Sequence, residues 1–141
     1  MIKRCLAYVS LLVDDYDSAL KYFCEVLEFI VLQDERISDE KRWVVVAPSV
    51  DGSALLLAKA STAEQRELVG KQGGGRVWLF LHTDNFNRDY SRMQRHGVRF
   101  EELPRNEAHG RVVIFVDRWG NRWDLIEPKC IGVSDLSTTE K

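Results

Sequence analysis

Few side chains in this sequence could carry out acid–base or nucleophilic chemistry. Among the histidines, His82 lies at the end of an apolar run and His109 directly precedes a glycine. An unperturbed imidazole has a pKa of about 6.5, which suits general acid–base catalysis or contact with a ligand. The simpler interpretations are a histidine at the rim of a strand for His82 and a solvated loop histidine for His109. His96 precedes Gly97 and is expected only to support the end of a helix.

The cysteines and the glycine-rich segment offer little further chemistry. Cys5, Cys24 and Cys130 are odd in number, and their spacing fits neither a CxxC motif nor a disulfide framework. None of them has, at a recognisable spacing, a basic residue that could activate it as a nucleophile. Their number and spacing favour a reduced, cytoplasmic setting. Residues 73–75 are three consecutive glycines, but they precede a strand pattern rather than a helix, so they do not form a phosphate-binding loop.

Apolar periodicity predicts the elements that must position these side chains. In the run from Val77 to Thr83, a period of two places Trp78, Phe80 and His82 on one face. A helix capped by Asp15 or Asp17 should follow the first strand, and a second helix should end at Gly97. Strands are expected over residues 5–13, 29–34, 42–48, 53–59, 77–83, 98–103, 111–117 and 121–127.

The two halves of the chain repeat one pattern. A shift of 70 residues places Tyr8 on Trp78 and Asp14 on Asp84. We therefore expect an α+β fold of two tandem βαβββ units that form a cupped mixed sheet. The units span about 5–59 and 76–128 within a single domain, 1–128. A linker with a short helix and the glycines joins them, and residues 129–141 are expected to be a flexible tail.

Composition excludes several classes of partner. The chain has 141 residues, of which 45% are hydrophobic and 30% charged, with a net charge of −2. This balance is typical of a soluble globular protein. Because positive and negative charges nearly cancel, the chain lacks the excess of positive charge that attracts nucleic acid. No apolar run approaches the roughly 20 residues that cross a bilayer, and the N-terminus does not read as a signal peptide. We expect a partner that is neither nucleic acid nor membrane.

Two motifs resemble those of the vicinal oxygen chelate superfamily, which contains glyoxalases, bleomycin resistance proteins and dioxygenases. Val13-Asp14-Asp15 before a helix is similar to the opening of that family's domain. The segment Asp117-Arg118-Trp119-Gly120-Asn121-Arg122-Trp123-Asp124-Leu125 resembles its closing turn and strand. The resemblance covers about residues 5–128 and implies the same fold. It does not fix the function, because this fold supports many different activities.

The same resemblance implies a metal site whose ligands are missing here. Enzymes of the superfamily commonly bind a divalent metal at four inward strand positions, which correspond to Tyr8, Leu56, Trp78 and Asp124. Leucine and tryptophan offer no basic lone pair to a cation, and tyrosine could bind one only as a phenolate. Asp124 alone would be a single weak ligand. We therefore expect no metal and no other cofactor.

The sequence leaves two classes of function open. The first is a binding or resistance protein that holds a small aromatic or amphipathic molecule in an apolar cup. The second is a superfamily enzyme of lyase, isomerase or dioxygenase type, with a rearranged metal site that uses Asp124 with His82 or His109. A purely structural module is less favoured, because this fold builds a concave face. Family resemblance also implies a homodimer. The expected ligand-binding residues are Tyr8, Leu56, Trp78, Phe80, His82, His109 and Asp124.

Overall fold

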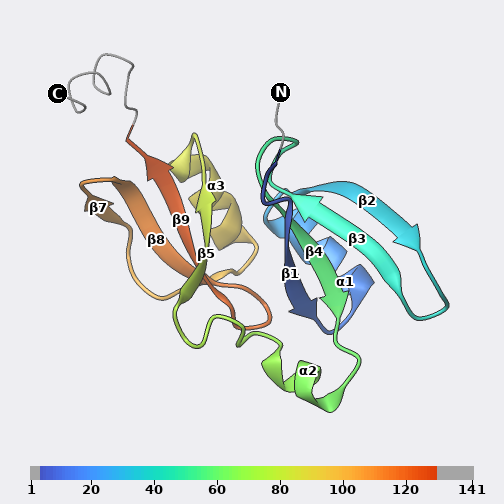
Figure 1. Cartoon of the computed structure of the whole chain (residues 1–141). Helices are drawn as coiled ribbons and strands as arrows, with labels where there is room; N and C mark the ends of the chain where they lie inside the picture. Colours follow the sequence, from blue (N-terminus) through green and yellow to red (C-terminus); the bar gives the residue numbers. More distant parts are fainter. Residues whose placement is uncertain (1–3, 130–141) are drawn as a thin grey trace.

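Two β-sheets with the same internal strand order organise the computed structural model, which describes residues 4–129 (Figure 1). The first half contains β1 (Tyr8–Val13), α1 (Tyr16–Lys21), the π-helical turn η1 (Tyr22–Val26), β2 (Ile30–Arg36), β3 (Arg42–Ala47) and β4 (Ala54–Lys59). After the linker helix α2 (Ala63–Leu68), the second half contains β5 (Val77–His82), α3 (Phe86–Arg95), β6 (Arg99–Phe100), β7 (Arg105–Glu107), β8 (Gly110–Val116) and β9 (Arg122–Pro128).

The strand pairing confirms the α+β fold class. The first sheet has the order β1-β4-β3-β2 and the second has the matching order β5-β9-β8-β6, with β7 paired to β8. In each sheet the first and last strands of the unit, β1 with β4 and β5 with β9, pair in parallel, and the remaining pairs are antiparallel. The expected cup is thus divided between two sheets that are not hydrogen-bonded to each other. The expected tail, apart from Lys129, lies outside the described residues.

Local capping explains where the helices begin and end. Asp15, one of the two expected caps, accepts a hydrogen bond from the Ser18 amide at 2.8 Å and starts α1. Thr62 caps α2 by accepting from the Gln65 amide at 3.0 Å. His96 is the C-cap of α3, and Gly97 follows it with a φ of 75°, a backbone conformation that favours glycine.

One expected strand is divided in two. Residues 98–103 were expected to form one continuous strand. In the structure β6 covers only Arg99–Phe100, and the separate strand β7 begins at Arg105. Pro104 lies between them; proline has no amide hydrogen and restricts the preceding residue, so the ladder breaks. At the break, the Glu102 carboxylate accepts a hydrogen bond from the Ile114 amide at 3.1 Å and replaces a ladder bond.

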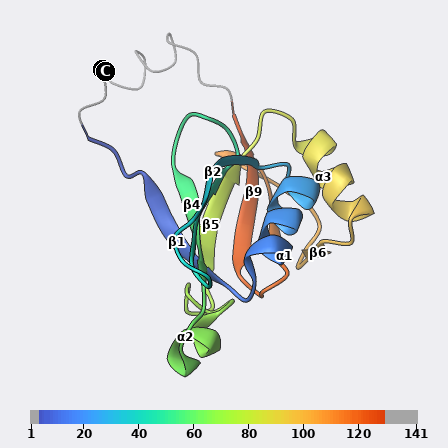
Figure 2. The same cartoon turned by 90° about the vertical axis from the view of Figure 1, so that its right-hand side faces the viewer.

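A single core joins the two halves. Helices α1 and α3 lie on the same side of the two sheets, and no helix within residues 4–129 covers the opposite faces (Figure 2). The buried cluster between helices and sheets includes Leu11, Phe23, Val44, Phe115 and Trp123, which come from both units. The Phe23 ring of the first unit stacks on Trp119 of the second, with ring centroids 5.7 Å apart. The two units therefore pack against each other through aromatic side chains.

The turn between β8 and β9 holds this aromatic contact in place. The buried carboxylate of Asp117 accepts hydrogen bonds from the amides of Trp119, Gly120 and Asn121 at 2.9–3.0 Å. Its second oxygen accepts from the Asn121 side chain and from the Trp123 indole at 3.0 Å.

No helix among residues 4–129 is both long and apolar enough to cross a membrane.

We expect Asp117→Ala to lower the free energy of unfolding by about 3 kcal/mol, because several buried donors lose their acceptor together. Urea denaturation followed by circular dichroism would measure the change. Asp51→Ala is the matched control: Asp51 is exposed in a turn, and its loss should change the free energy of unfolding by less than about 0.5 kcal/mol. Equal effects of the two substitutions would contradict the role given to Asp117.

Candidate ligand-binding site

The open face of the first sheet is aromatic and apolar. Tyr8 and Trp43 meet edge to face there, with ring centroids 6.2 Å apart, and the side chain of Tyr8 is 40% exposed. Leu56 and Trp43 pack on a second, small apolar cluster, which is separate from the main core. The side-chain amide oxygen of Gln33, Oε1, accepts hydrogen bonds from the Trp43 indole at 3.0 Å and from the Tyr8 hydroxyl at 3.4 Å. This network holds both rings in place.

Pairing across the sheet explains why these side chains meet. Val45 is the partner of both Gln33 on β2 and Leu56 on β4, so the three residues form one row. Because side chains alternate along a strand, Trp43 lies on the same face as Val45, and Tyr8 lies on the face opposite the buried Leu11. The structure thus brings together Tyr8 and Leu56, two of the expected site residues.

Trp43 was not among the expected site residues. Its alternation with Val45 along β3 was visible in the sequence, but nothing there showed that β3 lies beside β4 and that Trp43 would meet Tyr8. Trp78, which was expected in the cup, lies where the pairing of β5 with β9 shifts register between Val77 and Leu79. It is half-buried and packs against the main core cluster.

The open face of the second sheet combines an apolar ring with a carboxylate. Phe80 is 60% exposed and is the direct cross-strand partner of Asp124, so both side chains lie on the face opposite the buried Trp123 and Leu125. His82 follows two residues later on the same face of β5. This face therefore carries three of the expected site residues.

Asp124 forms no ion pair with any of residues 4–129, although charged groups lie near it. Burial raises the pKa of its carboxyl group, while Arg105, His109 and Arg122 act in the opposite direction. Arg105 is engaged by Glu102, with Nε and Oε1 2.9 Å apart, and Arg122 is engaged by Glu101. One buried oxygen of Asp124, Oδ1, consequently has no hydrogen-bond partner among the described residues. It is a polar atom that a ligand could use.

His109 lies in the turn between β7 and β8, where its side chain is exposed. Its imidazole acts to lower the pKa of the Asp124 carboxyl group, against the effect of burial. Its backbone carbonyl accepts a hydrogen bond from the Lys129 amide at 3.2 Å. The structure does not record a contact between His82 and His109, so it supports no histidine pair.

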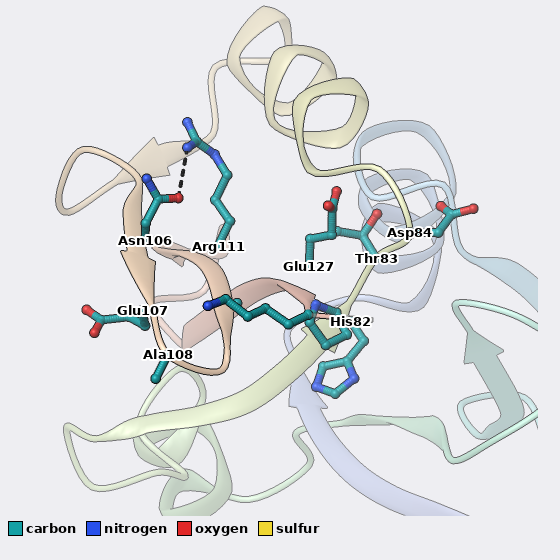
Figure 3. Close-up of a pocket in the computed structure, with 11 residues that line it drawn as sticks. His82, Thr83, Asp84, Asn106, Glu107, Ala108, Arg111 and Glu127 are labelled. Carbon is teal, nitrogen blue, oxygen red and sulfur yellow. Dashed lines mark hydrogen bonds between the residues drawn. The ribbon is translucent and has the colours of Figure 1, made fainter. Parts of the chain in front are cut away.

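A cavity of about 1130 Å³ opens beyond the end of the second sheet (Figure 3). His82, Asn106, Arg111 and Glu127 are among its lining residues, and Figure 3 shows Arg111 and Asn106 on one side and Glu127 on the other. Arg111 donates a hydrogen bond to the side-chain oxygen Oδ1 of Asn106 at 3.2 Å, and its guanidinium lies over the Phe86 ring. Glu127 accepts from the Phe86 amide at 2.7 Å. These groups already serve the fold, and His82 is the only expected site residue among them.

The residues present do not suit the metal that the family resemblance implies. Tyr8, Leu56, Trp78 and Asp124 together offer one carboxylate, a phenol, an indole and an aliphatic chain, whereas a divalent cation needs several convergent lone pairs. Within residues 4–129, no three histidine, cysteine, aspartate or glutamate side chains cluster closely enough to hold an ion.

Comparisons with known proteins agree with the fold. An uncharacterized protein from Shewanella frigidimarina (strain NCIMB 400) is 44% identical over 128 residues, which cover 89% of this chain and 95% of that protein. The crystal structure of TnmS3, an antibiotic binding protein from Streptomyces sp. CB03234, matches with a TM-score of 0.73 and 28% identity, over 92% of this chain and 99% of that one.

A second solved structure, that of UcmS2, matches with a TM-score of 0.75 and 29% identity, over 89% of this chain and 99% of that chain. Residues 5–125 match the family model described as the Glyoxalase/Bleomycin resistance protein/Dioxygenase superfamily. Since this match spans both sheets and both helices that cover them, the chain belongs to the glyoxalase/bleomycin resistance protein/dioxygenase superfamily.

Proposed function

We propose that this protein binds a small, flat and largely apolar molecule on the open faces of its sheets, without a metal ion. The observation that carries the proposal is the aromatic surface of Tyr8, Trp43 and Leu56, which no helix of the described residues covers (Figure 2). Exposed apolar surface of this kind is typical of ligand or partner sites. The antibiotic-binding activity named for TnmS3, a relative at 28% identity, supports the same class of function.

Each open face contributes differently to the proposed binding. The first sheet supplies the aromatic floor, on which a flat ring can stack or pack edge to face. The second sheet supplies Phe80 and the unpartnered oxygen of Asp124, which can orient a polar substituent of the ligand. His82 and His109 would contact the ligand at the rim of the second sheet. A cytoplasmic location remains part of the proposal and rests on the cysteine content.

An enzymatic function is the second candidate. It is favoured by Asp124, whose pKa is raised by burial and which lies within electrostatic range of His109. Raised carboxyl pKa values are frequent at catalytic sites, although structural carboxylates show them as well. This alternative would need a metal site built differently from the family's usual one, with Asp124 as a ligand.

We expect the fluorescent probe phenylnaphthylamine, which is neutral and aromatic, to bind the wild-type protein with enhanced emission. Tyr8→Ala and Phe80→Ala should each weaken its binding about fivefold or more, because each removes an exposed ring from the proposed cup. Leu103→Ala, at a side chain that is 81% exposed, is the matched control and should leave binding unchanged. Fluorescence titration measures all four proteins. No probe binding, or binding indifferent to both ring substitutions, would refute the cup.

Metal analysis separates the two candidate functions. We expect the protein to bind neither Ni²⁺ nor Zn²⁺ stoichiometrically in isothermal titration calorimetry, and we expect the triple variant Tyr8→His, Leu56→Glu, Trp78→His to gain measurable affinity. If the wild-type protein instead binds one ion per chain and Asp124→Ala abolishes that binding, the metal-free proposal fails and the enzyme candidate replaces it.

A homodimer is the proposed assembly, with a second copy covering part of the open faces and completing the cup. Apolar side chains available for this contact include Phe80, at 60% exposure, and Val31 on the edge strand β2, at 46%. Light scattering at micromolar concentration should give twice the 16.3 kDa of one chain. Phe80→Glu should shift the mass toward the monomer, whereas Leu103→Glu should not. A wild-type monomer would rule out this assembly.

A further inference from the structure

A notch with a volume of about 650 Å³ adjoins the aromatic surface where β3 begins and β4 ends, beside α2. Trp43 and Leu56, which belong to the proposed cup, line one part of it. Four cationic side chains line the rest of it, together with a single carboxylate from Glu40. The cationic residues are Lys41, Arg42, Lys59 and Arg66. The apolar floor of the first sheet therefore continues into a positively charged end.

Arg42 is already neutralised and serves the fold. Its guanidinium forms ion pairs with Asp17 at 2.7 Å and Asp34 at 2.8 Å, and it lies over the Tyr16 ring at 5.3 Å. These contacts tie the start of β3 to α1 and β2. A ligand anion would have to compete with two carboxylates for this group, so Arg42 contributes little charge to the notch.

The other three cations have no such partner. Lys41, Lys59 and Arg66 form no ion pair within 4.0 Å among residues 4–129. Asp15 is within electrostatic range of Lys59, but its carboxylate accepts the amide hydrogen of Ser18 at the start of α1. Lys41 precedes β3 and Lys59 ends β4, so the two lie at the same end of this antiparallel pair, and Arg66 comes from α2. All three cations line the same notch.

We propose that the notch receives the anionic group of an aromatic ligand, such as a carboxylate or sulfonate. The ring system of that ligand would lie on Tyr8, Trp43 and Leu56, and its anionic group would reach Lys41, Lys59 and Arg66. This inference rests on the proposed binding function and refines it, because it names an amphipathic aromatic anion as the ligand class. The lysine ammonium groups act as mobile point charges. The planar guanidinium of the arginine can donate hydrogen bonds to two oxygens of the anionic group at once.

Two fluorescent probes with the same ring system test the inference. Anilinonaphthalene sulfonate carries one sulfonate, and phenylnaphthylamine is its uncharged counterpart. In the triple variant Lys41→Gln, Lys59→Gln, Arg66→Gln, we expect sulfonate binding to weaken about tenfold, since each exposed charge pair contributes modestly. Binding of the neutral probe should change by less than about twofold. Raising the salt concentration should weaken binding of the sulfonate alone.

A matched control has the same change in net charge at other sites. Lys21, Lys71 and Arg95 form no recorded ion pair and line none of the cavities described, so replacing all three by Gln should leave both probes unaffected. Equal weakening in the notch variant and in this control would show a general charge effect and overturn the inference. So would unchanged sulfonate binding in the notch variant.

The probes also separate this inference from the proposal beneath it. If the neutral probe binds and depends on Tyr8 and Phe80, but the sulfonate gains nothing from the three cations, only the anion site is wrong. If neither probe binds, the cup itself is wrong and the anion site falls with it.

Discussion

The Asp117 carboxylate holds the turn on which the joining of the two halves depends. It accepts four hydrogen bonds from the segment that links β8 to β9 and a fifth from the indole of Trp123 on β9. In this arrangement Trp119 and Trp123 face Phe23 of the first unit, and the Trp119 indole donates to Asp14 at the end of β1 at 2.7 Å. The aromatic contact lies on the helical side, and among residues 4–129 the opposite face of each sheet carries no helix (Figure 2).

The two open faces differ in chemistry, and this difference directs the functional argument. The first is an aromatic floor with a glutamine that fixes two rings, and it runs into a cationic notch. The second carries Phe80 beside a carboxylate that lacks a hydrogen-bond partner for one oxygen. At the positions where the superfamily's enzymes commonly bind a metal, this chain carries mostly aromatic and aliphatic groups. Such a surface suits the binding of a hydrophobic molecule better than Lewis-acid chemistry.

The sequence predicted the alternating strands well and narrowed the cap of the first helix to two residues, because both features depend on neighbouring residues. Period-two runs located all the main strands, and Asp15 proved to be the cap of α1. The break at Pro104 was a local signal that could have been used, since proline cannot continue a ladder. The importance of Trp43 could not be predicted, because it depends on β3 lying between β2 and β4. The register shift at Trp78 depends likewise on the pairing of β5 with β9, which no local pattern reveals.

The tryptophan indole N–H resonances in an NMR titration with phenylnaphthylamine test the central claim most directly. Trp43 lies on the open face, whereas the indoles of Trp119 and Trp123 are bonded to Asp14 and Asp117 in the packed region between the units. Binding in the proposed cup should shift the Trp43 resonance, assigned by Trp43→Phe, and leave those of Trp119 and Trp123 in place. Saturable binding that leaves Trp43 unchanged would contradict a ligand site on this face.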